Sequence, residues 1–122
     1  RTAPQGLVIR FRNQNGLVAK VYRHLKARDY GEWPTLVGLA EQQGLSASSF
    51  RRQLQREGRS YQQIKDEVRR AMAFERLREG RLSIAEIAEQ TGFQEPSAFH
   101  RAFKKWTGHS PGSYRSQLLG RE

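Results

Sequence analysis

Two stretches of the chain nearly repeat one another: residues 36–44 read LVGLAEQQG, and residues 84–92 read IAEIAEQTG. In both stretches the apolar residues recur at helical spacing, which indicates an amphipathic helix. Both stretches end at a glycine, a residue that often terminates a helix because it adopts the left-handed conformation without strain. An internal repeat of this kind predicts that the same structural unit occurs twice in the chain.

A second apolar pattern follows each repeat after a short gap: FRRQLQREG begins at Phe50, and FHRAFKKWTG begins at Phe99. Two helices that cross steeply over a short turn form a helix-turn-helix unit, and this close crossing requires a small residue on the first helix. Ala40 and Ala88 stand at equivalent positions of the two repeats and meet this requirement. The repeats therefore predict two helix-turn-helix units.

Apolar residues at matching positions are expected to hold each unit together. The residue after the terminal glycine, Leu45 or Phe93, is predicted to pack beneath the turn. Residues one helical turn apart share a helix face, so an apolar pair anchors the second helix of each unit. These pairs are Phe50 with Leu54, and Phe99 with Phe103.

The opposite face of each second helix carries hydrogen-bond donors, many of them cationic. An arginine guanidinium can fork onto O6 and N7 of guanine, and other polar side chains can also reach base edges. The alternative interpretation is a solvated cationic surface without a specific ligand. The candidate DNA-binding residues are Ala47, Ser48, Arg51, Arg52, Gln55, Arg56, Ser97, His100, Arg101, Lys104 and Lys105.

Further helices are expected on both sides of the first repeat. One begins at Leu17, with Asn15 as its expected N-cap, and the next follows the Trp33-Pro34 break, with Thr35 as its N-cap. Residues 60–79 form one long helical pattern, about 30 Å long as a helix, which could hold two recognition helices near one turn of B-DNA apart. With a short last helix, the chain is predicted to be all-α, in about seven pieces.

The composition favours a polyanionic partner. The chain has 122 residues, and 22 Lys and Arg against 12 Asp and Glu give a net charge of +10. Such a surplus on one small domain favours nucleic acid as the partner. The absence of Cys excludes a disulfide scaffold and a thiolate metal site. No run approaches the roughly 18 uncharged apolar residues of a membrane span.

Residues 17–115 resemble the DNA-binding domain of the AraC/XylS family of bacterial transcription regulators. The most specific part is GFQEPSAFHRAFKKWTGHSPGSYR, residues 92–115, which is similar to the C-terminal signature of that family. LAEQQGLSASSFRRQL, residues 39–54, resembles its first helix-turn-helix, and RSYQQIKDEVRRAMAFERL, residues 59–77, resembles the linker helix of a subgroup with an N-terminal effector-sensing domain.

The resemblance implies two three-helix helix-turn-helix subdomains joined by a long linker helix, each inserting a recognition helix into the major groove. It implies a bacterial transcription regulator, an activator or a repressor, located in the cytoplasm at the nucleoid, that binds promoter or operator DNA. By position, Ser48, Arg51 and Arg52 match the first recognition face. The match on the second recognition face is to Ser97, His100 and Arg101.

The resemblance also divides the chain. Residues 1–15 are expected to be an arm or linker from an upstream domain that would receive any effector, and residues 16–122 the DNA-binding domain. Within it, the first helix-turn-helix is expected at about residues 35–57, the linker helix at about 60–79 and the second helix-turn-helix at about 83–107.

Two departures from the family pattern are visible. The first subdomain is one residue shorter before Gly58 than in many members, which implies a different exit into the linker helix. Pro96 stands where many members carry a polar residue that can touch DNA. It implies less direct base reading by the second helix, although proline suits the first turn of a helix.

Other functions have less support in the sequence. His24, His100 and His109 lie far apart, without a paired carboxylate or metal-ligand spacing, so we expect no catalysis, cofactor or metal. Trp33 and Trp106 are expected in the core rather than as platforms for single-stranded bases.

The main alternative function is a helical interaction module whose basic face docks an acidic protein, such as an RNA polymerase subunit, or a non-specific DNA binder. The sequence leaves open whether three further cations on the linker helix contact phosphates or serve only solubility: Arg69, Arg70 and Arg76.

Overall fold

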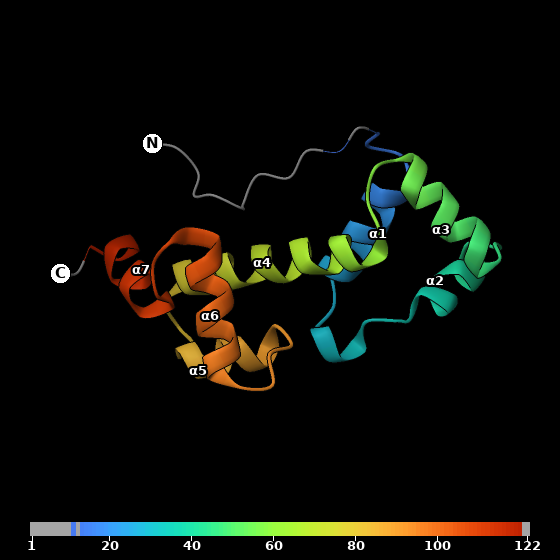
Figure 1. Cartoon of the computed structure of the whole chain (residues 1–122). Coiled ribbons are helices and arrows are strands. Elements are labelled where there is room, and N and C mark those ends of the chain that lie inside the picture. Colours follow the sequence, from blue (N-terminus) through green and yellow to red (C-terminus); the bar gives the residue numbers. More distant parts are fainter. Residues whose placement is uncertain (1–10, 12, 121–122) are drawn as a thin grey trace. The chain divides into compact units, whose positions relative to one another are not determined.

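The computed structural model describes residues 11 and 13–120, and in that part of the chain it contains helices, turns and no strand. The all-helical prediction is therefore confirmed. Most of the expected N-terminal arm, residues 1–10 and 12, lies outside the described residues. The helices, shown in Figure 1, are α1 Leu17–Lys26, the short 3-10 helix η1 Tyr30–Glu32, α2 Leu36–Gln42, α3 Ala47–Arg56, α4 Tyr61–Glu79, α5 Ile84–Gln90, α6 Pro96–Thr107 and α7 Pro111–Leu118.

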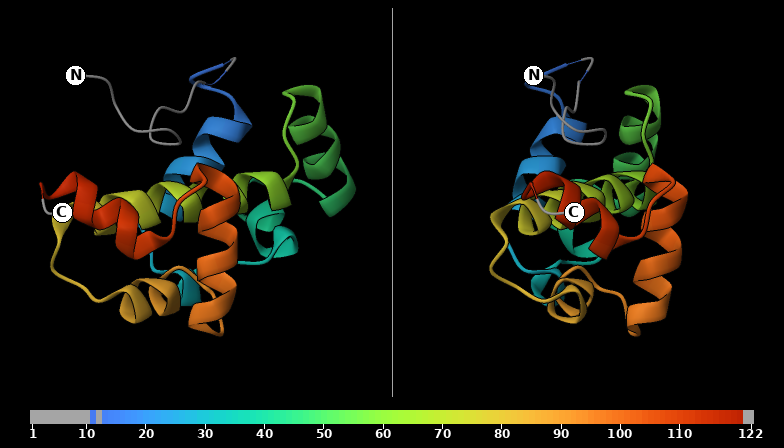
Figure 2. Two further views of the ribbon diagram at one scale, coloured as in Figure 1. Left: turned by 60° about the vertical axis from the view of Figure 1, so that its left-hand side comes forward. Right: turned by 90° about the vertical axis from the view of Figure 1, so that its left-hand side faces the viewer.

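The chain divides into two compact units, Ile9–Val68 and Arg69–Glu122. The first unit contains α1, η1, α2, α3 and the start of α4, and the second contains the rest of α4 with α5, α6 and α7. Each unit thus holds one of the two predicted helix pairs, α2 with α3 or α5 with α6. Within the second unit, α5 and α6 cross steeply in both views of Figure 2, as a helix-turn-helix requires.

The first unit buries one face of each of its helices. On α2 the buried residues are Leu39 and Ala40, and on α3 the predicted pair Phe50 and Leu54 is fully buried. Their partners on α1 and α4 follow helical spacing, so each helix turns one apolar stripe inward. These partners are Leu17, Val18, Val21, Tyr22 and Leu25 on α1, and Tyr61, Ile64 and Val68 on α4.

A buried tyrosine ties the start of α4 to the loop before α2. The hydroxyl of Tyr61 donates a hydrogen bond of 2.6 Å to the backbone oxygen of Pro34. Burial raises the pKa of Tyr61 to about 12, with a smaller contribution from the nearby Tyr30. The hydroxyl therefore stays protonated and keeps donating throughout the neutral pH range.

The second unit has an aromatic core. Phe99 and Phe103, the predicted anchor pair of α6, are both fully buried, and so are Ile87 and Ala88 on α5. The ring of Phe103 lies 5.3 Å from that of Phe74 on α4. Its ring also lies 5.2 Å from Tyr114 on α7 and 5.8 Å from Trp106. Such tilted and edge-to-face pairs are favourable, so Phe103 joins three helices.

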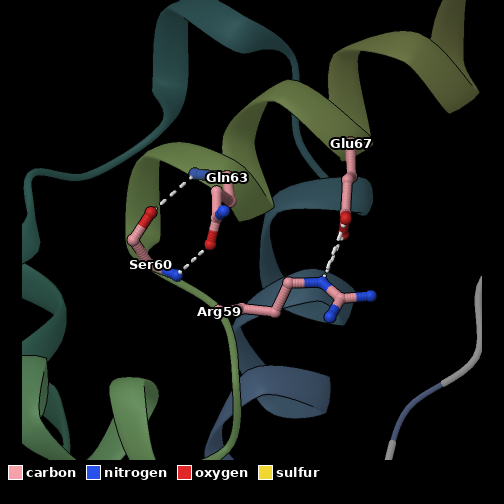
Figure 3. Close-up of polar contacts among 4 residues, drawn as sticks. All are labelled: Arg59, Ser60, Gln63 and Glu67. Atoms are coloured by element: carbon pink, nitrogen blue, oxygen red, sulfur yellow. Dashed lines mark hydrogen bonds and ion pairs between the residues drawn. The ribbon is translucent and has the colours of Figure 1, made fainter.

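Hydroxyl side chains start most of the helices. The prediction of Thr35 as an N-cap is confirmed, because its side chain accepts a hydrogen bond from the N–H of Gly38. Ser60 and Gln63 cap α4 reciprocally, through hydrogen bonds of 3.1 and 2.8 Å shown in Figure 3. The prediction of Asn15 as the cap of α1 is wrong: the N-cap residue of α1 is Gly16, which has no side chain to accept a hydrogen bond.

The two turns share one backbone geometry. Gly44 and Gly92 have φ angles of +71° and +88°, the left-handed conformation that the repeat predicts. The N–H of Leu45 donates to the oxygen of Ala40, and the N–H of Phe93 donates to that of Ala88, both at 2.9 Å. The prediction that Leu45 packs beneath the turn is wrong, because this side chain is 38% exposed.

The difference between the two turns lies in their side chains. The ring of Phe93 reaches those of Phe99 and Trp106, at centroid distances of 5.3 and 6.4 Å. Leu45 has the same backbone geometry as Phe93, but its shorter side chain remains exposed. A repeat in sequence therefore gave the same turn with a different depth of packing.

An arginine from α7 closes the C-terminal end of α4. The guanidinium of Arg115 donates hydrogen bonds to the backbone oxygens of Arg76, Leu77 and Leu82. The last carbonyls of a helix have no partner within the helix, so Arg115 satisfies two of them and also fixes the loop toward α5.

We expect Arg115→Ala to lower the free energy of unfolding by about 2–3 kcal/mol, because it leaves partly buried carbonyls of Arg76 and Leu77 without a charged donor. Urea unfolding followed by circular dichroism measures this loss. Arg81→Ala is the control, since Arg81 makes only a 3.6 Å surface ion pair with Glu79. Equal unfolding midpoints for the two variants would show that Arg115 does not hold α4.

Candidate nucleic-acid interface

The outward faces of α3 and α6 have the same pattern of exposure. Along each helix, two exposed residues are followed by a half-buried residue and then a buried one, and this order repeats. Each position of α3 corresponds to the position of α6 that lies 49 residues later in the chain. Of the eleven candidate DNA-binding residues, only Ala47 is half-buried and the others are exposed. The structure thus places the candidates in equivalent pairs: Ser48 with Ser97, Arg51 with His100, Arg52 with Arg101, Gln55 with Lys104 and Arg56 with Lys105.

Local hydrogen bonds order the face of α3. Its N-cap is Ser46, whose hydroxyl accepts a bond of 3.1 Å from the N–H of Ser49. The guanidinium of Arg52 lies 3.4 Å from the hydroxyl of Ser49, and that of Arg56 donates to the amide oxygen of Gln53 at 2.7 Å. Each arginine therefore has a partner on its own helix, three residues before it.

The start of α6 is built differently. Pro96 is its first residue, as expected, and Glu95 is the N-cap residue but makes no capping hydrogen bond with its side chain. Proline costs nothing here because the first N–H groups of a helix have no partner within it. The hydroxyl of Ser97 lies 3.4 Å from the carboxylate of Glu95.

Both faces are electropositive. Neither α3 nor α6 contains an acidic residue. Phosphate oxygens are attracted by such a surface, while arginine and polar side chains on it can read base edges. The exposed cations are Arg51, Arg52 and Arg56 on α3, and Arg101, Lys104 and Lys105 on α6.

Two arginines of α4 instead pack against aromatic rings of the second unit. Arg69 donates a hydrogen bond of 2.7 Å to the backbone oxygen of Thr91, and its guanidinium lies 4.1 Å from the centre of the Phe93 ring. Arg70 lies over Phe74 and Trp106, at 5.9 and 5.7 Å. Through these cation–π contacts both arginines pack against the aromatic side chains of their unit. The sequence pattern alone left the role of these arginines open.

Two polar residues that the sequence pattern did not single out form a pair at the end of α3: Gln53 within the helix and Glu57, its C-cap residue. Gln53 donates to the carboxylate of Glu57 at 2.9 Å, a pair four residues apart that helical spacing could have indicated. The same carboxylate accepts hydrogen bonds from the N–H groups of Leu17 and Val18, at 3.1 and 2.9 Å. That contact joins residues some 40 positions apart, so no local pattern could have indicated it.

The described residues contain no group of three or more His, Asp or Glu side chains placed to hold a metal ion. Burial, together with the nearby charge of Arg28, lowers the pKa of His24. This imidazole is therefore mostly neutral at pH 7 and adds little to the positive face. Among the residues that the structure covers, no helix is long and apolar enough to cross a membrane.

A family model described as a helix-turn-helix domain matches residues 39–117, more than half of the chain. The chain belongs to the AraC/XylS family. The ornithine utilization regulator of Pseudomonas aeruginosa is 43% identical over 102 residues, which cover 84% of this chain and 30% of that protein. The HTH-type transcriptional regulator VqsM of the same organism is 32% identical over 87 residues, covering 71% of this chain and 27% of that protein.

Solved structures of AraC/XylS relatives have the same fold. A DNA-binding transcriptional dual regulator from Escherichia coli K-12 aligns with a TM-score of 0.78 and 26% identity, covering 88% of this chain and 96% of that one. The transcriptional regulator CdpR from Pseudomonas aeruginosa aligns with a TM-score of 0.72 and 33% identity, covering 84% of this chain and 32% of that one. The chain is a DNA-binding domain of a transcription regulator, and its relatives are regulators rather than enzymes. It spans about 30% of the length of the curated relatives it matches.

Proposed function

We propose that this AraC/XylS domain, residues 16–122, recognises an operator sequence in double-stranded DNA with α3 and α6 as its two recognition helices, which enter successive segments of the major groove. The observation that supports this role is the matched exposure of the two helices. Each turns its apolar residues into its own unit and leaves polar and cationic side chains facing outward: arginine, serine and glutamine on α3, and arginine, lysine, histidine and serine on α6.

The outward side chains have different roles in DNA binding according to their chemistry. Contacts of Arg56, Lys104 and Lys105 with phosphates supply affinity and set the register of each helix on the duplex. Arg51, Arg52 and Arg101 read base edges, since a guanidinium can donate two parallel hydrogen bonds to guanine. The roles of the smaller side chains follow from their reach: Ala47 contacts thymine methyl groups, and Ser48, Ser97, Gln55 and His100 bond to bases or sugar–phosphate oxygens.

We also propose a place for this domain in a whole regulator of the bacterial cytoplasm. Its curated relatives are about three times as long as the chain, so effector control is assigned to a segment outside it. The regulatory role also includes contacts with subunits of RNA polymerase. These contacts use the basic surface that DNA does not cover. These two roles belong to the whole regulator, whereas DNA recognition can be measured on the domain itself.

The dependence of DNA binding on salt tests the electrostatic part of this function. We expect the dissociation constant of the domain for a random-sequence duplex to rise about a thousandfold between about 50 and 200 mM salt, because about six cations displace condensed counterions. Fluorescence anisotropy of a labelled duplex measures it. A flat plot of log Kd against log salt would contradict phosphate binding. Equal competition by selected and random duplexes would favour a non-specific binder.

A further inference from the structure

The first turn of α1 is capped by the residue that follows α3. Because Gly16 offers no side chain, the N–H groups of Leu17 and Val18 are satisfied by the carboxylate of Glu57, at 3.1 and 2.9 Å. Glu57 directly follows the last residue of α3. A Cβ at Gly16 would lie 2.6 Å from Oε1 of this carboxylate, so the glycine makes room for the contact.

The Glu57 carboxylate is fixed in its charged form. Burial alone would raise the pKa of Glu57, but the hydrogen bonds from Val18, Gln53 and Leu17, with the charge of Lys20, outweigh it and lower the pKa. The positive end of the α1 dipole favours a negative charge at this place. At neutral pH the carboxylate is therefore ionised and can accept several donors at once.

A chain of hydrogen bonds leads from this carboxylate to the outward face of α3. The side-chain amide of Gln53 donates from Nε2 to Glu57 at 2.9 Å, which leaves its oxygen Oε1 turned the other way. That oxygen accepts a hydrogen bond of 2.7 Å from Nη2 of Arg56. The amide is thus oriented by an anion on one side and presents an acceptor to a cation on the other.

We propose that Gln53 and Glu57 are positioning residues that hold the guanidinium of Arg56 in place on the DNA-facing surface of α3. The anchor of this arrangement is the first turn of α1. A guanidinium carries five N–H groups, so a bond to Gln53 and a contact with a phosphate are chemically compatible. A long side chain held in this way loses less conformational entropy when it binds DNA. This inference rests on the proposed DNA contact of Arg56.

The second recognition helix lacks the chemistry for the same arrangement. At the positions equivalent to Gln53, Arg56 and Glu57, α6 carries Ala102, Lys105 and Trp106. Alanine offers no acceptor and an indole has no carboxylate. Trp106 instead packs against the aromatic core of its unit, 5.8 Å from Phe103. The positioning device is therefore specific to the first helix-turn-helix.

A double-mutant cycle between Gln53 and Arg56 tests the proposal. Gln53→Met keeps the length of the side chain and removes both hydrogen bonds. The probe is a duplex selected by the wild-type domain from a random-sequence pool, and the readouts are Kd by anisotropy and the unfolding midpoint in urea. We expect Gln53→Met to weaken binding about threefold to tenfold in the wild-type background, and to cause no further loss in the Arg56→Ala background.

Glu57→Gln is the second variant, since it removes the charge while preserving the shape, and we expect it to show the same dependence on Arg56. The matched control is Gln62→Met, because Gln62 donates to Asp66 at 3.0 Å with the same spacing of four residues, but on α4. The control is expected to leave Kd unchanged.

Three outcomes would overturn the positioning role. The first is that Gln53→Met has no effect on Kd, and the second is that it weakens binding by the same factor in both backgrounds, as a general loss of stability would do. The third is that Arg56→Ala binds like the wild-type domain. In that case a loss of binding in Arg52→Ala leaves the proposed function standing, whereas normal binding by both arginine variants contradicts the proposed function itself.

Discussion

Replacement of Phe103 by alanine is expected to lower the free energy of unfolding by about 3–5 kcal/mol, the usual cost of removing a buried phenylalanine. Phe103 is fully buried and touches rings from α4, α7 and its own helix, at 5.2–5.8 Å. The alanine would leave a cavity among large, rigid neighbours that cannot close it. Small domains are stable by only about 5–15 kcal/mol, so this loss would remove much of the stability of the second unit.

Urea unfolding of the Phe103→Ala variant measures the loss, and DNA binding at a temperature near its unfolding midpoint shows the consequence for α6. Val37→Ala is the control, because Val37 is also apolar and helical but 52% exposed. A loss of less than about 1 kcal/mol in Phe103→Ala would contradict the account of the core that positions α6.

Replacement of Arg52 by alanine is expected to cost about 1–3 kcal/mol of DNA-binding free energy, which is about fivefold to 150-fold in Kd. Arg52 is exposed in the second turn of α3, with only a long contact of 3.4 Å to Ser49, so its guanidinium is available to a base. The loss should depend on the base pair that Arg52 reads, because a base contact is worth little when the base is wrong.

The measurement is Kd for the selected duplex and for versions of it with single base-pair changes. The wild-type domain should discriminate against changes at the position that Arg52 reads, and Arg52→Ala should not. Arg81→Ala is the control for removing one positive charge away from the recognition helices. An equal loss on every duplex would assign Arg52 to a phosphate instead of a base.

The helix-turn-helix units were predictable because the signals for them are local. A small residue at Ala40 and Ala88 is required by the crossing, and a glycine at Gly44 and Gly92 by the turn, and both requirements appear in the sequence itself. The outward faces of α3 and α6 follow from the apolar periodicity, since the residues between the buried ones must face outward. This explains why the candidate side chains are nearly all exposed.

The misjudged features depend on neighbours that are distant in sequence. Asn15 has the right chemistry for an N-cap, but the first turn of α1 is instead satisfied by Glu57, some 40 residues away. Leu45 has the same backbone turn as Phe93, but its side chain is 38% exposed, whereas the ring of Phe93 packs against those of Phe99 and Trp106. The role of the linker-helix arginines stayed open between phosphate contact and solubility, because the aromatic ring on which Arg69 packs lies in the second helix-turn-helix unit, more than 20 residues along the chain.

Sequence reading by both α3 and α6 is tested by sequencing the duplexes that the domain retains from a random pool, in parallel for the wild-type protein and for Arg52→Ala and Arg101→Ala. These two arginines occupy equivalent positions on α3 and α6. If both outward faces read DNA, the wild-type domain enriches a defined motif, and each variant loses preference at its own subset of positions. No enrichment by the wild-type domain, or the same uniform loss in both variants, would contradict sequence reading by α3 and α6.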